Sequence, residues 1–304
     1  MRLRALAPAK VNLGLALGGV RADGRHRLVT VFESLSLADT VELEVIESGE
    51  DVVVCPGVSG ENLAARALEA LRAHGWDGPP VRLTITKRIP VAAGMAGGSA
   101  DAAAALRLAM ALAPGRAEEV EQIAAGLGAD VPAQLLPGLV LGTGAGELVE
   151  RFEPLPEHAY AVVPAPFALP TPEVFREADR LELQRSDAEL DARYRALAAV
   201  LTARTRIPTE LLGNDLQAAA VSLRGWCGEA LEAVRATGAE QSFVSGSGPT
   251  VVGLWWGASA AELAGAAANL LKRRHPAATT ALPVDARFAA ASLTSCAGVE
   301  KSVD

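Results

Sequence analysis

A loop of small residues between an alternating strand and an alanine-rich helix constrains this fold more than any other segment. Apolar and polar side chains alternate over residues 81–87, which predicts a half-buried strand. Alanine and leucine dominate residues 99–112, which predicts a buried helix. The connecting segment comprises Pro90, Val91, Ala92, Ala93, Gly94, Met95, Ala96, Gly97, Gly98, Ser99 and Ala100. Because these side chains are small, the backbone can approach a ligand closely.

The start of this helix is a candidate anion site. N–H groups in the first turn of a helix lack intrahelical partners, and the helix dipole favours negative charge there. We therefore expect a cradle for nucleotide phosphates. The sequence also allows a plain turn in which Ser99 is the N-cap residue. The order of Gly94, Gly97 and Gly98 matches neither the P-loop nor the dinucleotide-binding pattern.

Composition is that of an ordinary globular protein and excludes several functions. The 304 residues are enough for two domains, with 50% hydrophobic and 21% charged residues. A formal net charge of −8 argues against a nucleic-acid partner but allows an anionic small-molecule substrate. No uninterrupted run of about 20 apolar residues is present, so we expect no membrane partner.

Cysteine and histidine usage favours a cytoplasmic protein. Cys55, Cys227 and Cys296 are odd in number and scattered, which is typical of a reducing compartment without a disulfide framework. The four histidines are also scattered, so we expect no structural metal site. No signal-peptide pattern is expected at the N-terminus. The oligomeric state stays open between a monomer and a homodimer.

Mixed strands followed by helices predict an α+β fold rather than a doubly wound parallel sheet. Strands are expected over residues 3–7, 11–17, 28–37, 41–45, 140–142, 148–151, 160–163, 241–245 and 251–256. Helices are expected over residues 62–74, 117–127, 171–180, 187–202, 211–223, 227–237 and 260–274. Segment 152–157 is the expected boundary between domains 1–155 and 156–304, and the tail beyond about Ser292 is expected to fray.

Three further blocks accompany the loop. Residues 8–13 read Pro-Ala-Lys-Val-Asn-Leu, with Asp-Gly-Arg-His following at 23–26. Residues 127–132 read Leu-Gly-Ala-Asp-Val-Pro, and residues 245–250 read Ser-Gly-Ser-Gly-Pro-Thr. The loop resembles the Pro-x-x-x-Gly-Leu-x-Ser-Ser-Ala pattern of the GHMP kinases, the galactokinase, homoserine, mevalonate and phosphomevalonate kinase superfamily. Its positions are held by Pro90, Gly94, Met95, Gly98, Ser99 and Ala100.

The four blocks in this order resemble one branch of that superfamily over about residues 3–284. That branch phosphorylates a cytidine diphosphate-linked methylerythritol in non-mevalonate isoprenoid biosynthesis. The resemblance implies a two-domain GHMP kinase fold, with a ribosomal-protein-S5-like N-terminal domain, a ferredoxin-like C-terminal domain and the active site between them. It implies ATP and Mg²⁺ as cofactors. The alternatives are another GHMP kinase of the homoserine or mevalonate type, or a nucleotide-binding regulator without catalysis.

Asp130 and Lys10 are the catalytic residues that the resemblance implies. Asp130 would accept the proton of the substrate hydroxyl, and Lys10 beside it would keep the carboxylate ionised and polarise the hydroxyl. From the residues alone, the favoured interpretation of Asp130 is a turn former, and Lys10 is then a solvated strand-end lysine. Asn12 shares the face of a strand with Lys10 and could bind a hydroxyl. Pro132 is expected to hold Val131 extended and outside a helix.

The implied substrate-binding residues lie in three segments. His26 would hydrogen-bond the cytosine edge, and Phe175, in one segment with Thr171, would stack on the ring. Without the resemblance, His26 is a surface turn residue and Phe175 a core residue of an amphipathic helix. Residues Gly246, Ser247 and Gly248 would line the cleft, although a hairpin turn explains them equally well. Asn214 and Asp215 match a pair of the branch, but the start of a helix explains them too.

Two departures from the branch pattern affect the expected site. Arg25 stands where the branch has a tyrosine, and its planar guanidinium could stack on cytosine or pair with the diphosphate. Ala92 and Ala93 stand where glycines are common. Alanine keeps the backbone N–H donor, so the cradle survives unless a positive φ is required there.

Overall fold

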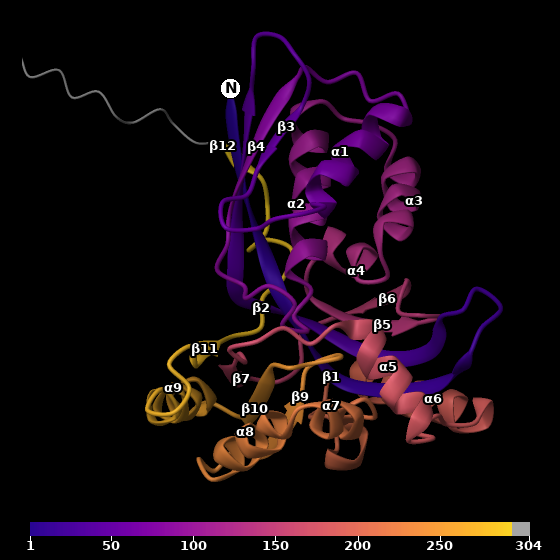
Figure 1. The fold of residues 1–304 in the computed structure, drawn as a ribbon, viewed down its shortest axis with the longest axis vertical. Helices are drawn as coiled ribbons and strands as arrows, with labels where there is room; N and C mark the ends of the chain where they lie inside the picture. Colours follow the sequence, from indigo (N-terminus) through magenta and orange to yellow (C-terminus); the bar gives the residue numbers. More distant parts are fainter. Residues whose placement is uncertain (294–304) are drawn as a thin grey trace, which may run out of the picture.

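The computed structural model describes residues 1–293, whose strands form two sheets arranged along the longest axis (Figure 1). The first sheet contains β1 (Arg2–Val20), β2 (His26–Val45), β3 (Val52–Val54), β4 (Val81–Thr86), β5 (Leu139–Thr143), β6 (Leu148–Phe152), β8 (Gly213–Asn214) and β12 (Ser292–Leu293). The second contains β7 (His158–Val163), β9 (Gln241–Val244), β10 (Val251–Trp256) and β11 (Thr279–Ala281). The expected α+β class is confirmed.

Strand order in the two sheets departs from sequence order. In the first sheet the order is β12-β1-β2-β4-β3, with β5 also beside β2, β6 beside β5 and β8 beside β1. In the second the order is β11-β7-β10-β9, and all its pairs are antiparallel. The expected fraying beyond Ser292 falls, apart from the short strand β12, on residues outside the described part.

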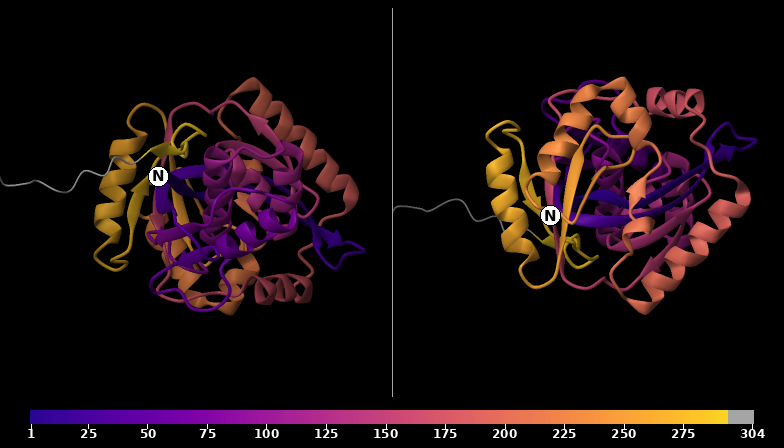
Figure 2. Two further views of the ribbon diagram at one scale, coloured as in Figure 1. Left: turned by 90° about the horizontal axis from the view of Figure 1, so that it is seen from above. Right: turned by 90° about the horizontal axis from the view of Figure 1, so that it is seen from below.

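Helices pack against both sheets. Those in the first half of the sequence are α1 (Leu63–Ala73), α2 (Gly97–Leu112), α3 (Ala117–Leu127) and α4 (Val131–Leu135). The others are α5 (Thr171–Arg180), α6 (Asp187–Ala203), η1 (Thr209–Leu211, 3₁₀), α7 (Gln217–Leu223), α8 (Gly225–Arg235) and α9 (Ala260–Leu271). Helices α8 and α9 pack on the second sheet, at its outside in Figure 2. No helix in residues 1–293 is long and apolar enough to cross a membrane.

Two long strands replace the four that were expected near the N-terminus. The register of β1 against β2 shifts between Pro8 and Lys10, between Asn12 and Gly14, and between Leu17 and Val20. At these points the two strands bend but stay paired, because a β-bulge increases the local twist of two paired strands without ending their pairing. The β1–β2 pair therefore runs through both halves of the molecule, and its turn projects from the body (Figure 2).

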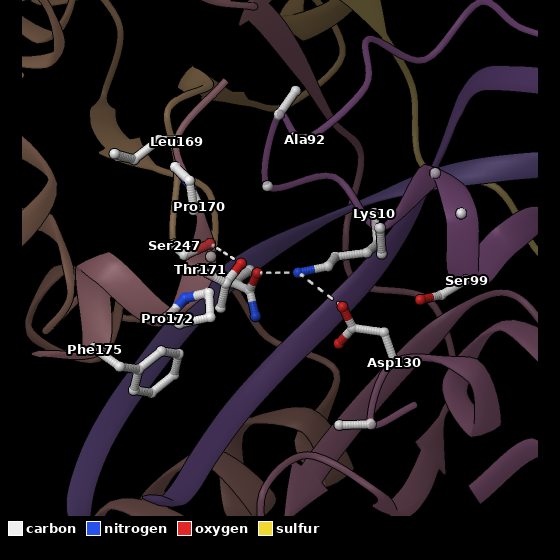
Figure 3. A pocket seen from close by; sticks show the side chains of 18 of the residues that line it. Lys10, Ala92, Ser99, Asp130, Leu169, Pro170, Thr171, Pro172, Phe175 and Ser247 are labelled. Carbon is white, nitrogen blue, oxygen red and sulfur yellow. Dashed lines mark hydrogen bonds and ion pairs between the residues drawn. The ribbon is translucent and has the colours of Figure 1, made fainter. Parts of the chain in front are cut away.

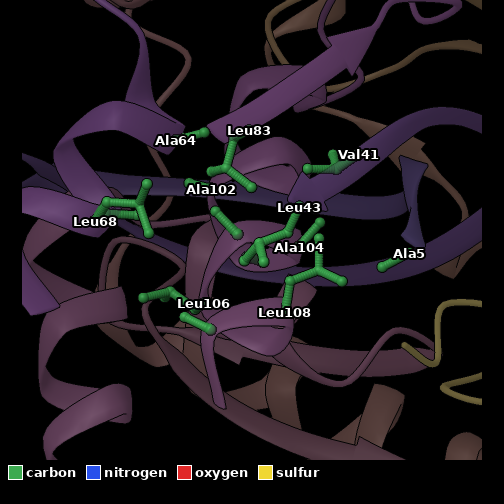
Figure 4. Close-up of a cluster of buried hydrophobic side chains, with 14 of the residues drawn as sticks. Ala5, Val41, Leu43, Ala64, Leu68, Leu83, Ala102, Ala104, Leu106 and Leu108 are labelled. Atoms are coloured by element: carbon green, nitrogen blue, oxygen red, sulfur yellow. The ribbon is translucent and has the colours of Figure 1, made fainter. Parts of the chain in front are cut away.

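Helix α2 forms the centre of the first core. The alanines at 102–105 are fully buried and pack among Leu43, Leu83 and Leu106 (Figure 4). Small side chains let the helix approach the sheet closely, so its N-terminus is held at a fixed height above the strands. This placement carries the loop before α2 to the middle of the molecule.

Most expected helices have their predicted limits, but the one over 211–223 is wrong. There the chain forms η1, then β8, and only then α7. The amide of Asn214 explains this because it donates to the carbonyl oxygens of Val244, at 2.8 Å, and Gly246, at 2.5 Å. Asn214 Oδ1 also accepts from the Leu216 N–H at 2.9 Å, directly before α7. These bonds hold the segment extended beside β1 and β9.

Both halves of the sequence contribute strands to the first sheet. Strands β8 and β12 come from the second half of the sequence but pair with β1 in the first sheet. The division into domains 1–155 and 156–304 stays a prediction, with Phe152 as the last residue of β6 and His158 as the first of β7.

A buried polar cluster connects the sheets. Glu33 of β2 accepts hydrogen bonds from the Tyr160 hydroxyl and, at 2.7 Å, from His158 Nε2, both on β7. Burial lowers the pKa of His158, but the Glu33 carboxylate outweighs it, so the pKa is raised above its usual value. His158 Nδ1 lies 2.7 Å from the Pro156 carbonyl oxygen and donates to it. A protonated imidazole therefore satisfies both acceptors.

The stability of the protein should fall as pH rises through the raised pKa of His158. A histidine with a raised folded-state pKa contributes fully below its unfolded pKa of about 6.5, and the contribution is lost above the folded value. We expect Glu33→Gln to flatten this dependence, whereas His74→Gln, at an exposed histidine, leaves it unchanged. Urea unfolding between about pH 6 and about pH 9 measures it, at about 1.4 kcal/mol per unit of pKa shift. If the free energy of unfolding changes with pH in the same way in wild type and Glu33→Gln, Glu33 does not raise the pKa of His158.

Candidate active site

A cavity of about 940 Å³ lies between the two halves of the molecule (Figure 3). It is bounded by the β1–β2 pair, the start of α2, the start of α5 and the turn between β9 and β10. Of the residues expected in the site, those lining the cavity are Lys10, Asn12, Arg25, His26, Pro90, Val91, Ala92, Ala93, Gly94, Ala96, Gly97, Gly98, Ser99, Asp130, Thr171, Phe175, Gly246 and Ser247. Met95, Ala100 and Gly248 lie behind this surface.

The phosphate loop, defined here as residues 90–96, leads into a helix start without a side-chain cap. Helix α2 begins at Gly97, and its N-cap position is held by Ala96 in the left-handed region, with a φ of 54°. The alternative in which Ser99 caps the helix is therefore wrong. Gly97, Gly98 and Ser99 form the first turn and line the cavity. Their N–H groups precede the first intrahelical donor, the Ala100 N–H, and are suited to an anion.

Two alanines in this region are strained. Ala92 has a φ of 52° and Ala96 a φ of 54°, where an L side chain costs about 1–2 kcal/mol. The exception named for the cradle, a positive φ where alanine replaces glycine, therefore occurs at Ala92 and not at Ala93. Surrounding contacts must hold the loop in this shape, since strained residues persist only where their environment over-determines them.

The phosphate loop contacts the turn over residues 245–250 through backbone atoms. A Cβ on Gly94, whose φ is 74°, would lie against the Ser245 carbonyl oxygen and 2.7 Å from that of Gly248. The Ser245 hydroxyl donates to the Gly94 carbonyl oxygen at 3.2 Å. The turn is therefore more than a hairpin between β9 and β10, because it closes one wall of the cavity.

The same turn contacts Lys10. A Cβ on Gly246 would lie 3.2 Å from Lys10 Nζ and 3.1 Å from Asn12 Oδ1. Lys10 Nζ donates to Asn12 Oδ1 at 2.6 Å, and it lies 3.8 Å from Asp130 Oδ2 and 5.1 Å from the centre of the Phe32 ring. The sequence expectation that Lys10 and Asn12 share one strand face is confirmed by this bond.

The electrostatics of Lys10 follow from its position. The side chain is almost fully buried, whereas that of Asp130 is 32% exposed. Burial lowers the pKa of Lys10, and the Asp130 carboxylate only partly offsets this effect. Lys10 and Asp130 thus present a cation and a carboxylate to the same point of the cavity (Figure 3).

Asp130 stands directly before a short helix, not in an extended segment. Val131 and Pro132 form the first turn of α4, so the expectation that Pro132 excludes helix at Val131 is wrong. Proline fits the first turn of a helix because the missing N–H has no partner there in any case. Arg107 donates to the Gln134 carbonyl oxygen at 2.5 Å. This bond fixes the far end of α4 and with it the position of Asp130.

An aromatic pair and a hydroxyl pair form the opposite end of the cavity. The rings of His26 and Phe175 lie 5.0 Å apart, at 34° to one another. His26 Nε2 is 2.7 Å from Asp179 Oδ1. The hydroxyls of Thr171 and Ser247 are 2.8 Å apart and connect α5 to the turn after β9. This end therefore offers one aromatic face and several polar groups.

Arg25 lines the cavity from the turn between β1 and β2. Its Nε lies 3.2 Å from Asp23 Oδ2, and its Nη2 lies 3.8 Å from Glu147 Oε1. Arg21 also binds Glu147 Oε1, at 2.7 Å, and ties the turn to the β5–β6 connection. The guanidinium of Arg25 is half exposed, so its face is open toward the cavity.

Sequence reasoning missed several residues of the cavity. Asp179, which holds His26, lies four residues after Phe175 and hence on the same face of α5, but its partner is 153 residues away. Phe32, Lys87 and Asp101 also line the cavity. Only the spacing of Phe175 and Asp179 was a usable signal, since the other contacts join distant segments.

The fold is that of the GHMP kinases. Residues 62–138, which include the phosphate loop and Asp130, match the family described as the GHMP kinases N-terminal domain. The chain belongs to the family of 4-diphosphocytidyl-2-C-methyl-D-erythritol kinases. It is 44% identical to a protein of that name from Rhodococcus jostii, covering 86% of this chain and 88% of the relative. A protein of the same name from Streptomyces coelicolor is 43% identical, covering 87% and 92%.

Solved structures agree with this assignment. A crystal structure titled 4-(cytidine 5'-diphospho)-2C-methyl-D-erythritol kinase is 35% identical, with a TM-score of 0.74, and covers 92% of this chain and 98% of that one. Homoserine kinase from Cytophaga hutchinsonii has a TM-score of 0.70 at 16% identity, covering 96% and 97%. The second likeness shows the GHMP kinase fold alone.

Gly94→Ala should destabilise the protein by at least about 2 kcal/mol, because alanine is strained at this φ and its Cβ would displace the 245–250 turn. Gly126→Ala is the matched control: Gly126 lies within α3 with open space around it, so we expect a gain of about 0.5–1 kcal/mol. Urea unfolding of both variants measures these changes. If Gly94→Ala unfolds at the wild-type urea concentration, the two loops are not in contact in solution.

Proposed function

We propose that the protein transfers the γ-phosphoryl group of ATP to the 2-hydroxyl of 4-diphosphocytidyl-2-C-methyl-D-erythritol, giving the 2-phosphate and ADP in non-mevalonate isoprenoid precursor biosynthesis. The names of the relatives support the substrate. The observation that carries the proposal is the position of Lys10, 3.8 Å from Asp130, in the cavity that also receives the start of α2. Phosphoryl transfer needs a phosphate site, charge neutralisation and a group that takes the hydroxyl proton, and all three lie in this cavity.

Asp130 accepts the proton of the attacking hydroxyl. Its carboxylate is partly exposed and has Lys10 as the neighbouring cation. Lys10 stabilises the ionised carboxylate and polarises the hydroxyl oxygen as the proton leaves. Asn12 orients Lys10 through the 2.6 Å bond to its Nζ. The hydroxyl oxygen then attacks the γ-phosphorus in line with the leaving oxygen of ADP.

The phosphate loop and the first turn of α2 hold the ATP phosphates. Gly97, Gly98 and Ser99 present N–H groups at a helix start that no side chain caps. Because the loop side chains are small, the phosphates can reach these donors. The backbone contact between Gly94 and the 245–250 turn keeps the loop in place before ATP binds.

Mg²⁺ fits this site with few protein ligands. Within residues 1–293 no group of three or more acidic, histidine or cysteine side chains gathers as a metal site. Mg²⁺ is commonly held by one or two protein oxygens together with substrate phosphates. Ser99 is the residue that would hold it, and it would neutralise charge on the phosphate oxygens.

The other end of the cavity takes the cytidine. His26 Nε2 faces the Asp179 carboxylate, so it carries a proton and leaves Nδ1 as an acceptor in the neutral ring. The cytosine amino group is a matching donor, and Phe175 beside His26 offers a stacking face. Thr171, Ser247 and the backbone of Gly246 bound the space toward the diphosphate, and Gly248 lies behind them.

These features distinguish the proposal from its alternatives. Homoserine and mevalonate contain no nucleobase, so a kinase for either one needs no aromatic pair such as His26 and Phe175 to bind its alcohol substrate. A nucleotide-binding regulator needs no Lys10 and Asp130 pair.

The proposed partners are small molecules of a cytoplasmic pathway, with no nucleic acid. Every site residue comes from one chain, so a monomer or a homodimer suffices.

The direct test is ADP release by the purified protein with Mg·ATP. We expect turnover with 4-diphosphocytidyl-2-C-methyl-D-erythritol and none with mevalonate or homoserine, since only the first places cytosine against Phe175. Asp130→Asn should lower kcat by about 10²–10⁴-fold with ATP affinity unchanged, because proton transfer is lost while the phosphate site stays intact.

Glu118→Gln, an exposed carboxylate in the first turn of α3, is the control and should keep wild-type kcat. Turnover on another alcohol would keep the kinase and overturn the substrate. Retained turnover in Asp130→Asn would remove Asp130 from the mechanism, and ATP binding without turnover on any alcohol would favour the regulator.

Arg25 should contribute to cytidine binding through its planar face. We expect Arg25→Ala to raise the KM for the cytidine substrate by about 10-fold, equivalent to about 1.4 kcal/mol, with the KM for ATP unchanged. Arg25→Tyr separates the two roles considered for this residue, because tyrosine stacks but carries no charge. A KM near that of wild type in Arg25→Tyr indicates stacking, and a KM as high as in Arg25→Ala indicates pairing with the diphosphate. Unchanged affinity in Arg25→Ala would exclude both.

A further inference from the structure

Two buried carboxylates share one lysine beneath the phosphate loop, and none of the three takes part in the mechanism above. Lys87, just after β4, binds Asp39 of β2 and lies 2.6 Å from Asp101 Oδ2 in α2. Asp39 is fully buried, and Asp101 nearly so. Lys87 and Asp101 also line the cavity. We call Asp39, Lys87 and Asp101 the Lys87 cluster.

Asp39 holds the chain where the phosphate loop begins. Its Oδ1 accepts from the N–H of Ile89 at 2.8 Å and from the N–H of Arg88 at 2.5 Å, while its Oδ2 accepts from Lys87. One buried carboxylate thus binds three donors from three consecutive residues. The backbone immediately before Pro90 is fixed to β2 by these bonds.

Asp101 holds the helix where the loop ends. It is the fifth residue of α2, and its bond to Lys87 ties this helix to the end of β4. A Cβ on Gly97 would lie 3.3 Å from Lys87 Nζ, so the lysine sits directly against the first residue of α2. Lys87 therefore contacts both ends of the loop through its two acidic partners.

The charges of the cluster show that the arrangement is costly. Burial raises the pKa of Asp101 to about 7 although Lys87 lowers it, and Asp101 Oδ1 has no hydrogen-bond partner among residues 1–293. Asp101 faces Lys87, Asp39 and, from the segment after β3, Cys55. A cluster of two carboxylates and one ammonium adds little net stability in a buried place. A role in holding a particular geometry explains its presence better.

We infer that Asp39 and Asp101 are positioning residues for ATP binding: through Lys87 they fix both ends of the phosphate loop in its binding shape. The loop needs such a device, because Ala92 and Ala96 are strained and no side chain caps α2. Without the cluster the strained residues relax, and ATP must restore the loop when it binds. The free energy of ordering then weakens ATP affinity.

ATP binding without the alcohol substrate tests this inference. It rests on the proposed kinase function, but calorimetric titration of Mg·ATP needs no turnover, so the two can fail separately. We expect Asp39→Asn and Asp101→Asn each to raise the Kd for ATP by about 10-fold or more. Amide hydrogen exchange over residues 91–98 should speed up without ATP, while exchange over α3 stays as in wild type.

Asp51→Asn is the matched control. Asp51 lies at the opposite end of β4, where its Oδ1 accepts from the Val81 N–H at 2.9 Å and its carboxylate binds Arg72. Like Asp39, Asp51 accepts hydrogen bonds from a backbone N–H and from a basic side chain, but it does not contact the phosphate loop. We expect a loss of stability similar to that of Asp39→Asn, with the Kd for ATP within about twofold of wild type.

The kinetic constants give an independent readout. With the cytidine substrate, Asp39→Asn and Asp101→Asn should raise the KM for ATP and leave the KM for the alcohol unchanged. Asp101→Asn keeps the hydrogen bonds that the Arg88 and Ile89 N–H groups donate to Asp39. If Asp39→Asn does not fold, Asp101→Asn alone therefore tests the inference. A wild-type Kd for ATP and wild-type exchange over residues 91–98 in Asp101→Asn would overturn the inference. So would an equal rise in Kd in Asp51→Asn.

Discussion

The backbone contact between the phosphate loop and the 245–250 turn is the constraint on which the site depends. Gly94 leaves no room for a Cβ against the carbonyl oxygens of Ser245 and Gly248, and Gly246 leaves almost none against Lys10. The phosphate loop follows β4 of the first sheet, whereas the turn joins β9 and β10 of the second. Because the contact is made by main-chain atoms, it fixes the distance between the start of α2 and the 245–250 turn.

Two lysines in the cavity show how surroundings separate similar side chains. Lys87 lies between two buried carboxylates, which raise its pKa although burial lowers it, and it stays bound within the fold. Lys10 has one partly exposed carboxylate at 3.8 Å, and burial lowers its pKa. In the roles proposed above, Lys87 is bound by two carboxylates and fixes the positions of the segments around it. Lys10, with a single carboxylate at 3.8 Å, can still bind a substrate oxygen.

Local patterns predicted the elements that carry a local signal. The apolar stripe between Asn62 and His74 gave α1, with Asn62 accepting from the Ala64 N–H as its N-cap. Alternation gave β4. The prediction failed where distant groups supply the hydrogen bonds: Asn214 binds carbonyls of the β9 region, and Pro132 begins α4 instead of excluding helix. Likewise Ser99 lost the capping role to a left-handed Ala96, whose conformation no local rule favours.

The sequence by itself determined the family resemblance, the position of the phosphate loop before an alanine-rich helix, and the shared strand face of Lys10 and Asn12. These follow from residue type and short-range spacing, because strand alternation and helix starts act over a few residues. Only the tertiary structure decided that Lys10 lies beside Asp130, that Asp179 holds His26, and that Asp39 and Asp101 share Lys87. Most of these pairs join segments far apart in the chain, and their distances are set by how α2, α4 and α5 pack against the two sheets.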